Sequence, residues 1–286
     1  MKYGIWRHEN ALGNGAEHVI NLAQTIKLWE DDSPEVYVEN DWQRMMARCI
    51  PNITDDKIKL FPDLASMEYK SSNWLGFNNL SLQDIYMPGV YPFIKTYPAG
   101  WNNLLIHENP PLVFPVDDYK NIHALPKDVI VITLREHKTH WKREEGDSSE
   151  HQRYVKIDTF HKLALYYADL GYKVVRIGSN KETDFPKHEN IIDFAKYTNR
   201  TLLDDLYLID NSRVFISTDS GIWPMACGLK RKTVVTNVSY YGNQYTQWVP
   251  KETTSIMFKE NLVANLSCSC TDNNINDIIK SVERFL

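Results

Sequence analysis

The sequence of 286 residues contains no uncharged apolar run that approaches the roughly 18 residues of a membrane-spanning helix. Its amino terminus, MKYGIWRHEN, also lacks the apolar stretch of about 7 to 15 residues that marks a secretory signal peptide. Cysteine is scarce, with four residues in the sequence. They form no C-x-x-C pair and are too few for the disulfide framework of a short secreted domain. We therefore expect a cytoplasmic protein without a transmembrane segment.

An excess of positive charge is missing as well. Lysine and arginine together number 32, aspartate and glutamate 37, and the net charge is −5. A protein that attracts nucleic acid or an anionic membrane through its overall field needs the opposite sign. Nucleic acid is therefore not an expected partner, and its recognition would require a local basic patch.

The familiar metal-binding motifs are absent too. H-E-x-x-H does not occur in the sequence. Cys268 and Cys270 have no second pair of ligands at a suitable spacing, so two ordinary thiols are the simpler interpretation. We expect no metal site.

What the sequence does contain is an alternation of strand-like and helix-like segments. The first half predicts strands at the start of the chain, over 34–41 and over 56–62, and helices around Val19 to Ile26 and over 42–50. Alternation of this kind is typical of a parallel α/β sheet.

Residues 62–128 form a less regular region that is rich in asparagine, proline and tyrosine. It includes two short strand candidates, 104–108 and 112–116. The region ends in a segment, 121–128, whose proline and polar residues are typical of a linker. We therefore predict two domains, an amino-terminal one over 1–127 and a carboxyl-terminal one over 128–286.

The second half repeats the alternation more clearly, and Thr201 and Asp204 have the spacing of a capping box. Strands are predicted over 129–136, 172–179, 213–218 and 232–238. Helices are predicted from Ile157 to a stop at Gly171, over 201–212, over 221–229 and over 275–286, with a short segment of undefined type at 189–198. This order predicts a β-α-β-α-β unit.

Three strands of the second half end in polar or small residues: Arg135-Glu136, Gly178-Ser179 and Asp219-Ser220-Gly221. The carboxyl ends of parallel strands meet at the edge where ligands of open α/β sheets bind, so these residues are expected to converge. A diphosphate there would be held by helix N–H groups and by Arg135, with Gly221 allowing close approach of the backbone. The alternative is that Asp219 only caps a helix over 222–229.

The segments VIVITLRE, GYKVVRIGS, TLLDDLYLIDNSRVFISTDSG and WPMACGLKRKTVVTNV resemble the carboxyl-terminal domain of GT-B glycosyltransferases. They are similar in particular to bacterial surface-polysaccharide glycosyltransferases and more distantly to the ADP-heptose heptosyltransferases, in which a strand leads into (T/S)DSG. The resemblance covers roughly residues 129–245. It implies two Rossmann-like domains that face a cleft, a nucleotide-diphosphate-sugar as donor substrate, and no cofactor.

Carried over to the matching positions, the resemblance implies a donor site in the second domain. Arg135 would face the diphosphate, Gly178 and Ser179 would lie beside the nucleoside, and Asp219, Ser220 and Gly221 would line the phosphate or sugar. Trp223 stands near the position where heptosyltransferases carry a histidine, which leaves the donor undefined. The predicted substrate-binding residues of this domain are Arg135, Arg176, Gly178, Ser179, Asp219, Ser220, Gly221 and Trp223.

In the first domain, HENALGNGAEHVINLAQ resembles the first strand-loop-helix of the heptosyltransferases, where a glycine-aspartate pair supplies the catalytic base. The matching pair here is Gly13-Asn14, and asparagine cannot accept a proton at neutral pH. Another base must reach the acceptor hydroxyl directly or through one water. The predicted residues are Glu17 or His18, followed by Glu9, for catalysis and Gly13, Asn14 and Gly15 for substrate binding. The alternative for each acid or histidine is a solvated loop charge, or a carboxylate that the helix dipole favours at the start of a helix.

The predicted activity is transfer of a sugar from a nucleotide-diphosphate-sugar to an acceptor hydroxyl of a glycan or surface polysaccharide, with inversion. Metal-independent transfer is expected because the sequence lacks the D-x-D pair of many GT-A enzymes. A non-catalytic nucleotide-sugar or glycan-binding protein is an alternative that Asn14 favours. A glycosyltransferase of modified DNA is a further alternative, against which the net charge argues, and UDP-sugar 2-epimerases fit less well because an expected second glycine and glutamate cluster are missing.

Overall fold

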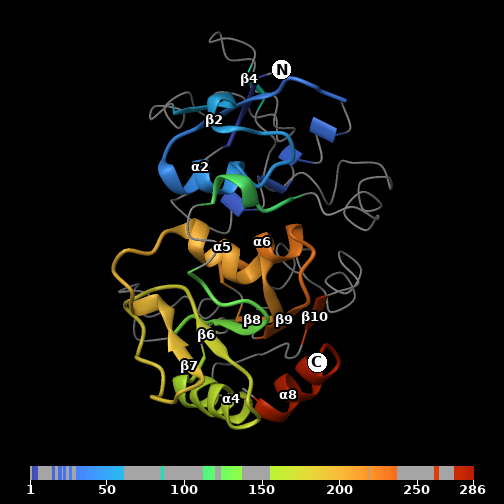
Figure 1. The fold of residues 1–286 in the computed structure, drawn as a ribbon. Coiled ribbons are helices and arrows are strands. Elements are labelled where there is room, and N and C mark those ends of the chain that lie inside the picture. The colour runs from blue at the N-terminus through green and yellow to red at the C-terminus, as the bar shows by residue number, and fades with distance from the viewer. Residues whose placement is uncertain are drawn as a thin grey trace, which may run out of the picture. The chain divides into compact units, whose positions relative to one another are not determined.

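A computed structural model describes residues 2–5, 15–16, 19–20, 22–23, 26–27, 30–60, 85–86, 112–119, 124–136, 155–218, 220–236, 261–263 and 274–286. The chain divides into two compact units, Met1–Tyr119 and Lys120–Leu286 (Figure 1). A domain boundary between residues 127 and 128 remains a prediction from the sequence.

The first unit is built on a parallel sheet in the order β3-β2-β1-β4. Its strands are β1 (Lys2–Gly4), β2 (Glu35–Val38), β3 (Ile58–Leu60) and β4 (Ile85–Tyr86), and α2 (Asp41–Ala47) follows β2 directly. The side chain of Asn40 accepts a hydrogen bond from the Gln43 N–H and caps α2. The predicted strand at the chain start, those over 34–41 and 56–62, and the helix over 42–50 are confirmed.

A helical segment precedes β2 in the first unit. The residues described between positions 15 and 27 are helical, and Val19, Leu22, Ala23 and Ile26 are buried. Their spacing of three and four residues places them on one helix face. The helix predicted from that spacing is confirmed.

The strand predicted over 112–116 is wrong. Leu112 and Phe114 are buried and Val113 is exposed, which reproduces the alternation of a strand, but the segment is irregular and runs into a short 3₁₀ helix, η4 (Val116–Asp118). Val113 donates its N–H to Cys49 O, which lies beyond α2 and not in a strand, and Pro115 has no N–H to give to a ladder. The other candidate, 104–108, lies outside the described residues.

The second unit contains a six-stranded sheet in the order β10-β9-β8-β5-β6-β7, with every pair parallel. The strands are β5 (Val129–Thr133), β6 (Val174–Arg176), β7 (Ile191–Asp193), β8 (Ser212–Thr218), β9 (Thr233–Thr236) and β10 (Asn261–Val263). The chain therefore builds outward from β5 through β6 to β7, crosses back to β8, and builds outward on the other side. This is the doubly wound Rossmann order, and it confirms the parallel α/β fold predicted from the sequence.

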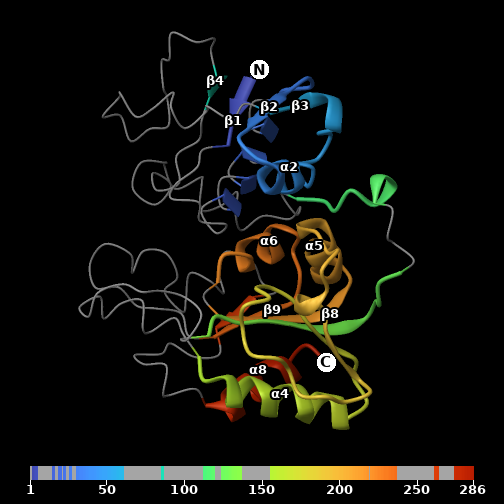
Figure 2. The same ribbon diagram turned by 90° about the vertical axis from the view of Figure 1, so that its left-hand side faces the viewer.

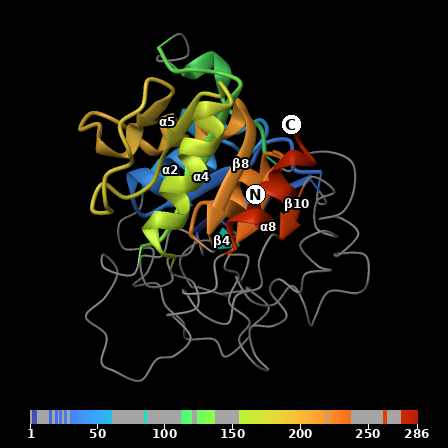
Figure 3. The ribbon, with the colours of Figure 1, turned by 90° about the horizontal axis from the view of Figure 1, so that it is seen from below.

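Helices cover both faces of this sheet. Figures 1 and 2 show α5 (Leu202–Asp210) and α6 (Trp223–Gly228) on one face and α4 (Ile157–Asp169) and α8 (Ile275–Glu283) on the other. Seen from the side of the second pair, α4 and α8 lie next to each other across the sheet (Figure 3). Because β5 is covered on both faces, all five of its residues are buried. The core on the α4 and α8 side includes Ile130, Ile132, Phe160, Leu163, Tyr167, Val214, Ile216, Ile278 and Val282.

The helix ends test two predictions. The capping box at α5 is confirmed, because the Thr201 hydroxyl accepts from the Asp204 N–H while the Asp204 carboxylate accepts from the Thr201 N–H. The predicted short helix is confirmed as α6, which begins at Trp223 with Ile222 as its N-cap residue. Asp219, the alternative capping residue, lies outside the described residues. None of the helices that the structure describes is long and apolar enough to cross a membrane.

Candidate functional site

The strand order of the second unit defines one place where ligands of such sheets bind. The order reverses between β5 and β8, and open α/β sheets bind their ligands beyond the carboxyl ends of the strands at such a reversal. Thr133, the last residue of β5, lies opposite Ser217 of β8, and Thr218 lies opposite Thr236 at the end of β9. The three strands therefore end at nearly the same level, and the residues that follow them share one edge of the sheet.

The turn after β8 carries a cluster of hydroxyl groups. Ser217 Oγ lies 3.0 Å from Ser220 Oγ and donates to the carbonyl of Thr218 at 2.6 Å. The Thr218 hydroxyl is buried and has no hydrogen-bond partner among the described residues. Ser220 and Gly221 are half-buried, and Trp223, at the start of α6, is buried. The turn thus presents small polar groups at the edge of the sheet, directly before α6.

The turn after β6 requires a glycine. Gly178 has φ of +106°, a conformation that L-residues rarely adopt. A Cβ added at this position would lie 2.7 Å from Thr133 Oγ1 at the end of β5. Gly178 and Ser179 are both half-buried. The absence of a side chain lets the end of β6 approach the end of β5 at the switch point.

Arg176 of β6 lies beneath this turn. Its side chain is 1% exposed, its Nη1 and Nη2 donate to the carbonyls of Thr183 (2.5 Å) and Ser179 (2.8 Å), and its Nε lies 3.1 Å from Asp193 Oδ1. Burial lowers the pKa of the Arg176 guanidinium, and the neighbouring Asp193 carboxylate opposes that shift. All three guanidinium nitrogens are thus engaged: two hold the loop that follows β6, and the third pairs with the last residue of β7.

Two further side chains hold the same loop. Glu136, which follows β5 and is 3% exposed, accepts from the Thr183 N–H at 2.8 Å and from the Thr183 hydroxyl at 2.9 Å. Lys196 donates to the carbonyls of Asn180 (2.9 Å) and Glu182 (2.6 Å). The loop over 178–184 is therefore fixed to the ends of β5, β6 and β7.

An arginine-aspartate pair connects the turn after β6 to helix α5. Arg200 Nη1 lies 2.6 Å from Asp205 Oδ2, and Arg200 Nη2 donates to the carbonyl of Gly178. Asp205 is 4% exposed, and burial raises its pKa to about 6, although Arg200 acts in the opposite direction. No pattern in the sequence indicates this pair, because its members are five residues apart and belong to no motif.

The predicted site residues fall into three groups. Arg135, Arg176, Gly178, Ser179, Ser220, Gly221 and Trp223 all belong to the ends of β5, β6 and β8 or to the start of α6. Gly15 belongs to the first unit, where an added Cβ would lie 2.5 Å from the Trp42 ring, so a close packing of the helical segment against α2 requires it. Glu9, Gly13, Asn14, Glu17, His18 and Asp219 lie outside the described residues.

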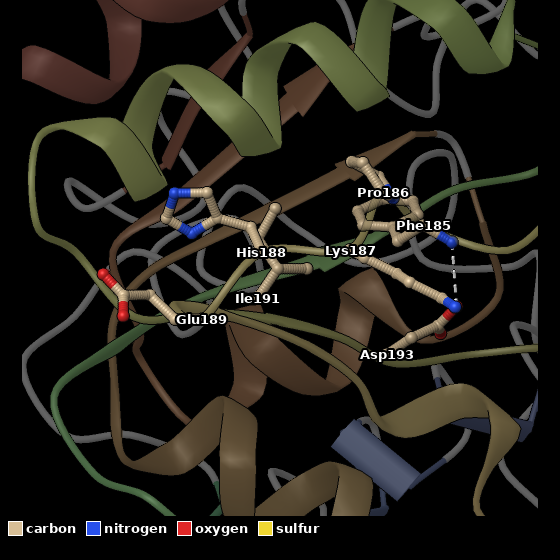
Figure 4. A pocket seen from close by; sticks show the side chains of 7 residues that line it. All are labelled: Phe185, Pro186, Lys187, His188, Glu189, Ile191 and Asp193. Atoms are coloured by element: carbon tan, nitrogen blue, oxygen red, sulfur yellow. Dashed lines mark hydrogen bonds between the residues drawn. The ribbon is translucent and has the colours of Figure 1, made fainter.

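A surface hollow of about 510 Å³ lies beside β7 (Figure 4). The Phe185 N–H donates to Asp193 Oδ2 at 2.9 Å on one side of it, and His188 and Glu189 lie on the other. Its lining residues are Phe185, Pro186, Lys187, His188, Glu189, Ile191 and Asp193. None of the predicted site residues lines this hollow, so it is separate from the switch point.

Among the residues that the structure describes, no three His, Cys, Asp or Glu side chains are grouped so that they could hold a metal ion.

Comparison with solved structures identifies the fold. The Escherichia coli heptosyltransferase WaaC, solved with ADP-2-deoxy-2-fluoro heptose, matches with a TM-score of 0.54 and 10% sequence identity over 99% of each chain. A family 9 glycosyl transferase from Veillonella parvula matches with a TM-score of 0.58 and 11% identity, over 99% of this chain and 95% of the other. This chain has the fold of these glycosyltransferases. No protein-family model and no curated protein matches the sequence.

The glycosyltransferase fold was predicted from the resemblance of the second half to GT-B glycosyltransferases, and the match to solved glycosyltransferases confirms that prediction. The match spans the whole chain, whereas the sequence resemblance covered roughly residues 129–245. At about one identical residue in ten, the similarity defines the arrangement of the strands and helices. The chemistry has to be argued from the side chains that this chain places on that arrangement.

Proposed function

We propose that this protein is a glycosyltransferase that moves a sugar from a nucleotide-diphosphate-sugar to an acceptor hydroxyl. The observation that carries the proposal is the switch point of the second unit, where the β5, β6 and β8 ends combine a positive-φ glycine, a turn rich in hydroxyl groups and Arg135. The fold shared with solved glycosyltransferases supports it.

The donor diphosphate is expected to lie over the turn after β8. The Ser220 N–H donates to the Thr218 carbonyl at 2.6 Å, and the Ser220 hydroxyl is paired with Ser217 Oγ. The backbone N–H groups of Gly221 and Ile222 are therefore the ones expected to face the phosphate oxygens. Arg135, half-exposed after β5, supplies a charge-assisted hydrogen bond to the same group. Gly178 and Ser179 are then expected to border the nucleoside. Asp219 and Trp223 are expected to border the phosphate or the sugar. We assign Arg176 a positioning role, because its nitrogens hold the loop after β6.

The transfer step is a displacement at the anomeric carbon. The acceptor oxygen forms a bond to that carbon, the bond from the carbon to the diphosphate oxygen breaks, and a base takes the hydroxyl proton. Arg135 and the backbone N–H groups stabilise the negative charge that develops on the leaving diphosphate. Inversion and independence of a metal ion belong to this proposal.

The base and the acceptor remain predictions from the sequence. Glu17 or His18, followed by Glu9, are the proposed bases, with Gly13, Asn14 and Gly15 beside the acceptor. A glycan or surface polysaccharide is the proposed acceptor. A cleft between the two domains and a cytoplasmic location also stay predictions.

Nucleotide-sugars of different bases and sugars, incubated with the purified protein and scored for transfer and hydrolysis, test the function. Turnover of one donor, reduced at least about tenfold in Arg135→Ala, is the expected result, because loss of a charged hydrogen bond to the leaving group removes about 1.5–3 kcal/mol. Arg213→Ala is the control, since Arg213 pairs with Asp128 at the opposite, amino-terminal end of the sheet.

The same experiment separates the rival functions. Binding of a nucleotide-sugar without turnover, unchanged in Glu17→Ala and His18→Ala, would identify a non-catalytic binding protein, which the Gly13-Asn14 pair favours. If the protein neither binds nor turns over any donor, both the glycosyltransferase and the non-catalytic binding protein are contradicted. A steep loss of DNA affinity with rising salt would be required before a DNA substrate is considered.

A further inference from the structure

Four side chains fix the loop that follows β6, and one of them holds the glycine at its start. Glu136, Arg176 and Lys196 bind the part of the loop from Ser179 to Thr183, as described above. Arg200 instead donates through Nη2 to the carbonyl of Gly178 itself. Gly178 is also the residue that touches Thr133 at the end of β5. Arg200 therefore acts on the part of the loop nearest the switch point.

Asp205 faces the same glycine from the first turn of α5. Its carboxylate pairs with Arg200 Nη1 at 2.6 Å, and the Gly178 N–H faces the carboxylate and lowers its pKa. The carbonyl and the N–H of Gly178 are thus both directed at the pair. Such an arrangement holds the two peptide units that flank Gly178, and so keeps this residue in a φ region that L-residues rarely adopt.

The burial of this pair argues for a role beyond stability. Asp205 is 4% exposed, and the Arg200 side chain is 18% exposed. Removing two charges from water has a cost that their attraction barely offsets, so well-packed apolar residues at the same positions are often as stable or more stable. What apolar residues cannot do is direct a donor at the Gly178 carbonyl.

The pair also connects to the turn after β8 through the strand ends. Gly178 contacts Thr133, Thr133 is in register with Ser217, and Ser217 Oγ lies 3.0 Å from Ser220 Oγ. A displacement of Gly178 would therefore change the space beside both turns that border the switch point.

We propose that Arg200 and Asp205 form a positioning pair that holds the turn at Gly178 and Ser179 in the shape that receives the nucleoside of the donor. This inference rests on the proposed function and deepens it. Neither residue is expected to touch the reacting atoms. Their effect is on nucleotide affinity and on KM for the donor, with a smaller effect on kcat.

Arg200→Lys tests the proposal most sharply. The ammonium keeps the charge beside Asp205, but it lacks the planar fork that reaches two partners at once, so the Gly178 carbonyl loses its donor. Arg213→Lys is the matched control, because it makes the same substitution in a pair with Asp128 in the same unit. Calorimetric titration with UDP, GDP and ADP, and melting temperatures of all three proteins, are the measurements.

The expected result is that Arg200→Lys weakens nucleotide binding about tenfold to a hundredfold, the range that small misplacements cause, while its melting temperature stays near that of Arg213→Lys. Where turnover is measurable, KM for the donor rises more than kcat falls. If Arg200→Lys melts near the assay temperature, Asp205→Asn, which keeps the side-chain shape, is used in its place. The same loss of nucleotide affinity and the same rise in KM for the donor are expected of it.

Two other results would overturn the inference, and they are distinct. Wild-type affinity in Arg200→Lys, with the wild-type protein binding a nucleotide, contradicts the positioning pair and leaves the proposed function standing. Failure of the wild-type protein to bind any of the three nucleotides removes the proposed function and the inference together.

Discussion

At position 178, both the backbone conformation and the packing require a glycine. Its φ of +106° disfavours any side chain, and the space that a Cβ needs is occupied by Thr133 Oγ1 at 2.7 Å. Gly171, at the carboxyl end of α4, has φ of +87° but meets no atom within 4 Å of an added Cβ. A comparison of the two glycines therefore separates the free-energy cost of a side chain at positive φ from the cost of its clash with Thr133.

Gly178→Ala is expected to lower the free energy of unfolding more than Gly171→Ala does. An L-residue at positive φ loses about 1–2 kcal/mol, which both variants share, and only Gly178→Ala adds the clash with Thr133. Urea unfolding of each variant gives the two values. Combining Gly178→Ala with Thr133→Ala, measured against Thr133→Ala alone, is expected to recover the excess; equal losses at the two glycines would show that the β5 and β6 ends are not in close contact.

Asp205 makes stability depend on pH. Burial raises its folded-state pKa to about 6, above the value of about 3.8 for a free carboxyl. Between these values the folded protein binds more protons than the unfolded chain, so this group makes the free energy of unfolding fall as pH rises from about 4 to about 6. The charged groups that face it among the described residues are Arg200 and Asp204, which shift the pKa in opposite directions.

Asp205→Asn is expected to remove this dependence. Relative to the wild-type protein, the variant should gain on the order of 1–3 kcal/mol between pH 4 and pH 6, measured by urea unfolding at each pH. Asp128→Asn provides a control of opposite sign, because the hydrogen bond from Arg213 lowers the pKa of Asp128 and the stability it supplies is lost only as pH falls. A difference between Asp205→Asn and wild type that stays constant with pH would contradict a raised Asp205 pKa.

Among the elements, those that a sequence can predict are the ones whose own residues carry the signal. β5, β6, β8 and β9 are each built around consecutive apolar residues, and α4 shows apolar residues at helical spacing. The order of these elements, and hence the convergence of three strand ends, could therefore be predicted from the sequence. The switch point follows from that order, because parallel strands bring their carboxyl ends to one edge.

Other elements depend on partners that are distant in the sequence. β10 consists of three residues and was not predicted; it is defined by its pairing with β9. β7, where only a segment of undefined type was predicted, is also three residues long and only half-buried. Residues 112–116 gave the opposite error: a strand was predicted there, but the segment pairs with no strand among the described residues. In each case pairing, and not local propensity, decides the structure.

The candidate site likewise contains some residues that the sequence predicts and others that depend on contacts distant in the chain. Gly178, Ser220 and Gly221 follow strands that could be predicted, so their location could be predicted too. Arg200 and Asp205 could not be found in this way, because the Gly178 carbonyl that Arg200 contacts is 22 residues earlier in the chain. Arg176 was predicted to bind substrate, whereas in the structure two carbonyls and the Asp193 carboxylate occupy its guanidinium.

At the scale of the whole molecule, the second unit has the features of an independent folding unit. Its six strands pair only with one another within the described residues, and every member of its main apolar core lies between residues 130 and 285. Its strand order contains the complete switch point. A domain with its own sheet and core is expected to fold by itself.

Residues 120–286, expressed alone, are therefore expected to unfold in one cooperative transition by urea and by heat. If the donor contacts lie in this unit, the fragment should bind the nucleotide recognised by the full chain with an affinity within about tenfold, because the loop after β6 and the turns after β5 and β8 are all present. The same fragment with Arg200→Lys serves as the control and should bind more weakly. A fragment that unfolds without cooperativity would contradict the division at residue 120, whereas a folded fragment that has lost nucleotide binding would show that residues before 120 contribute contacts to the donor.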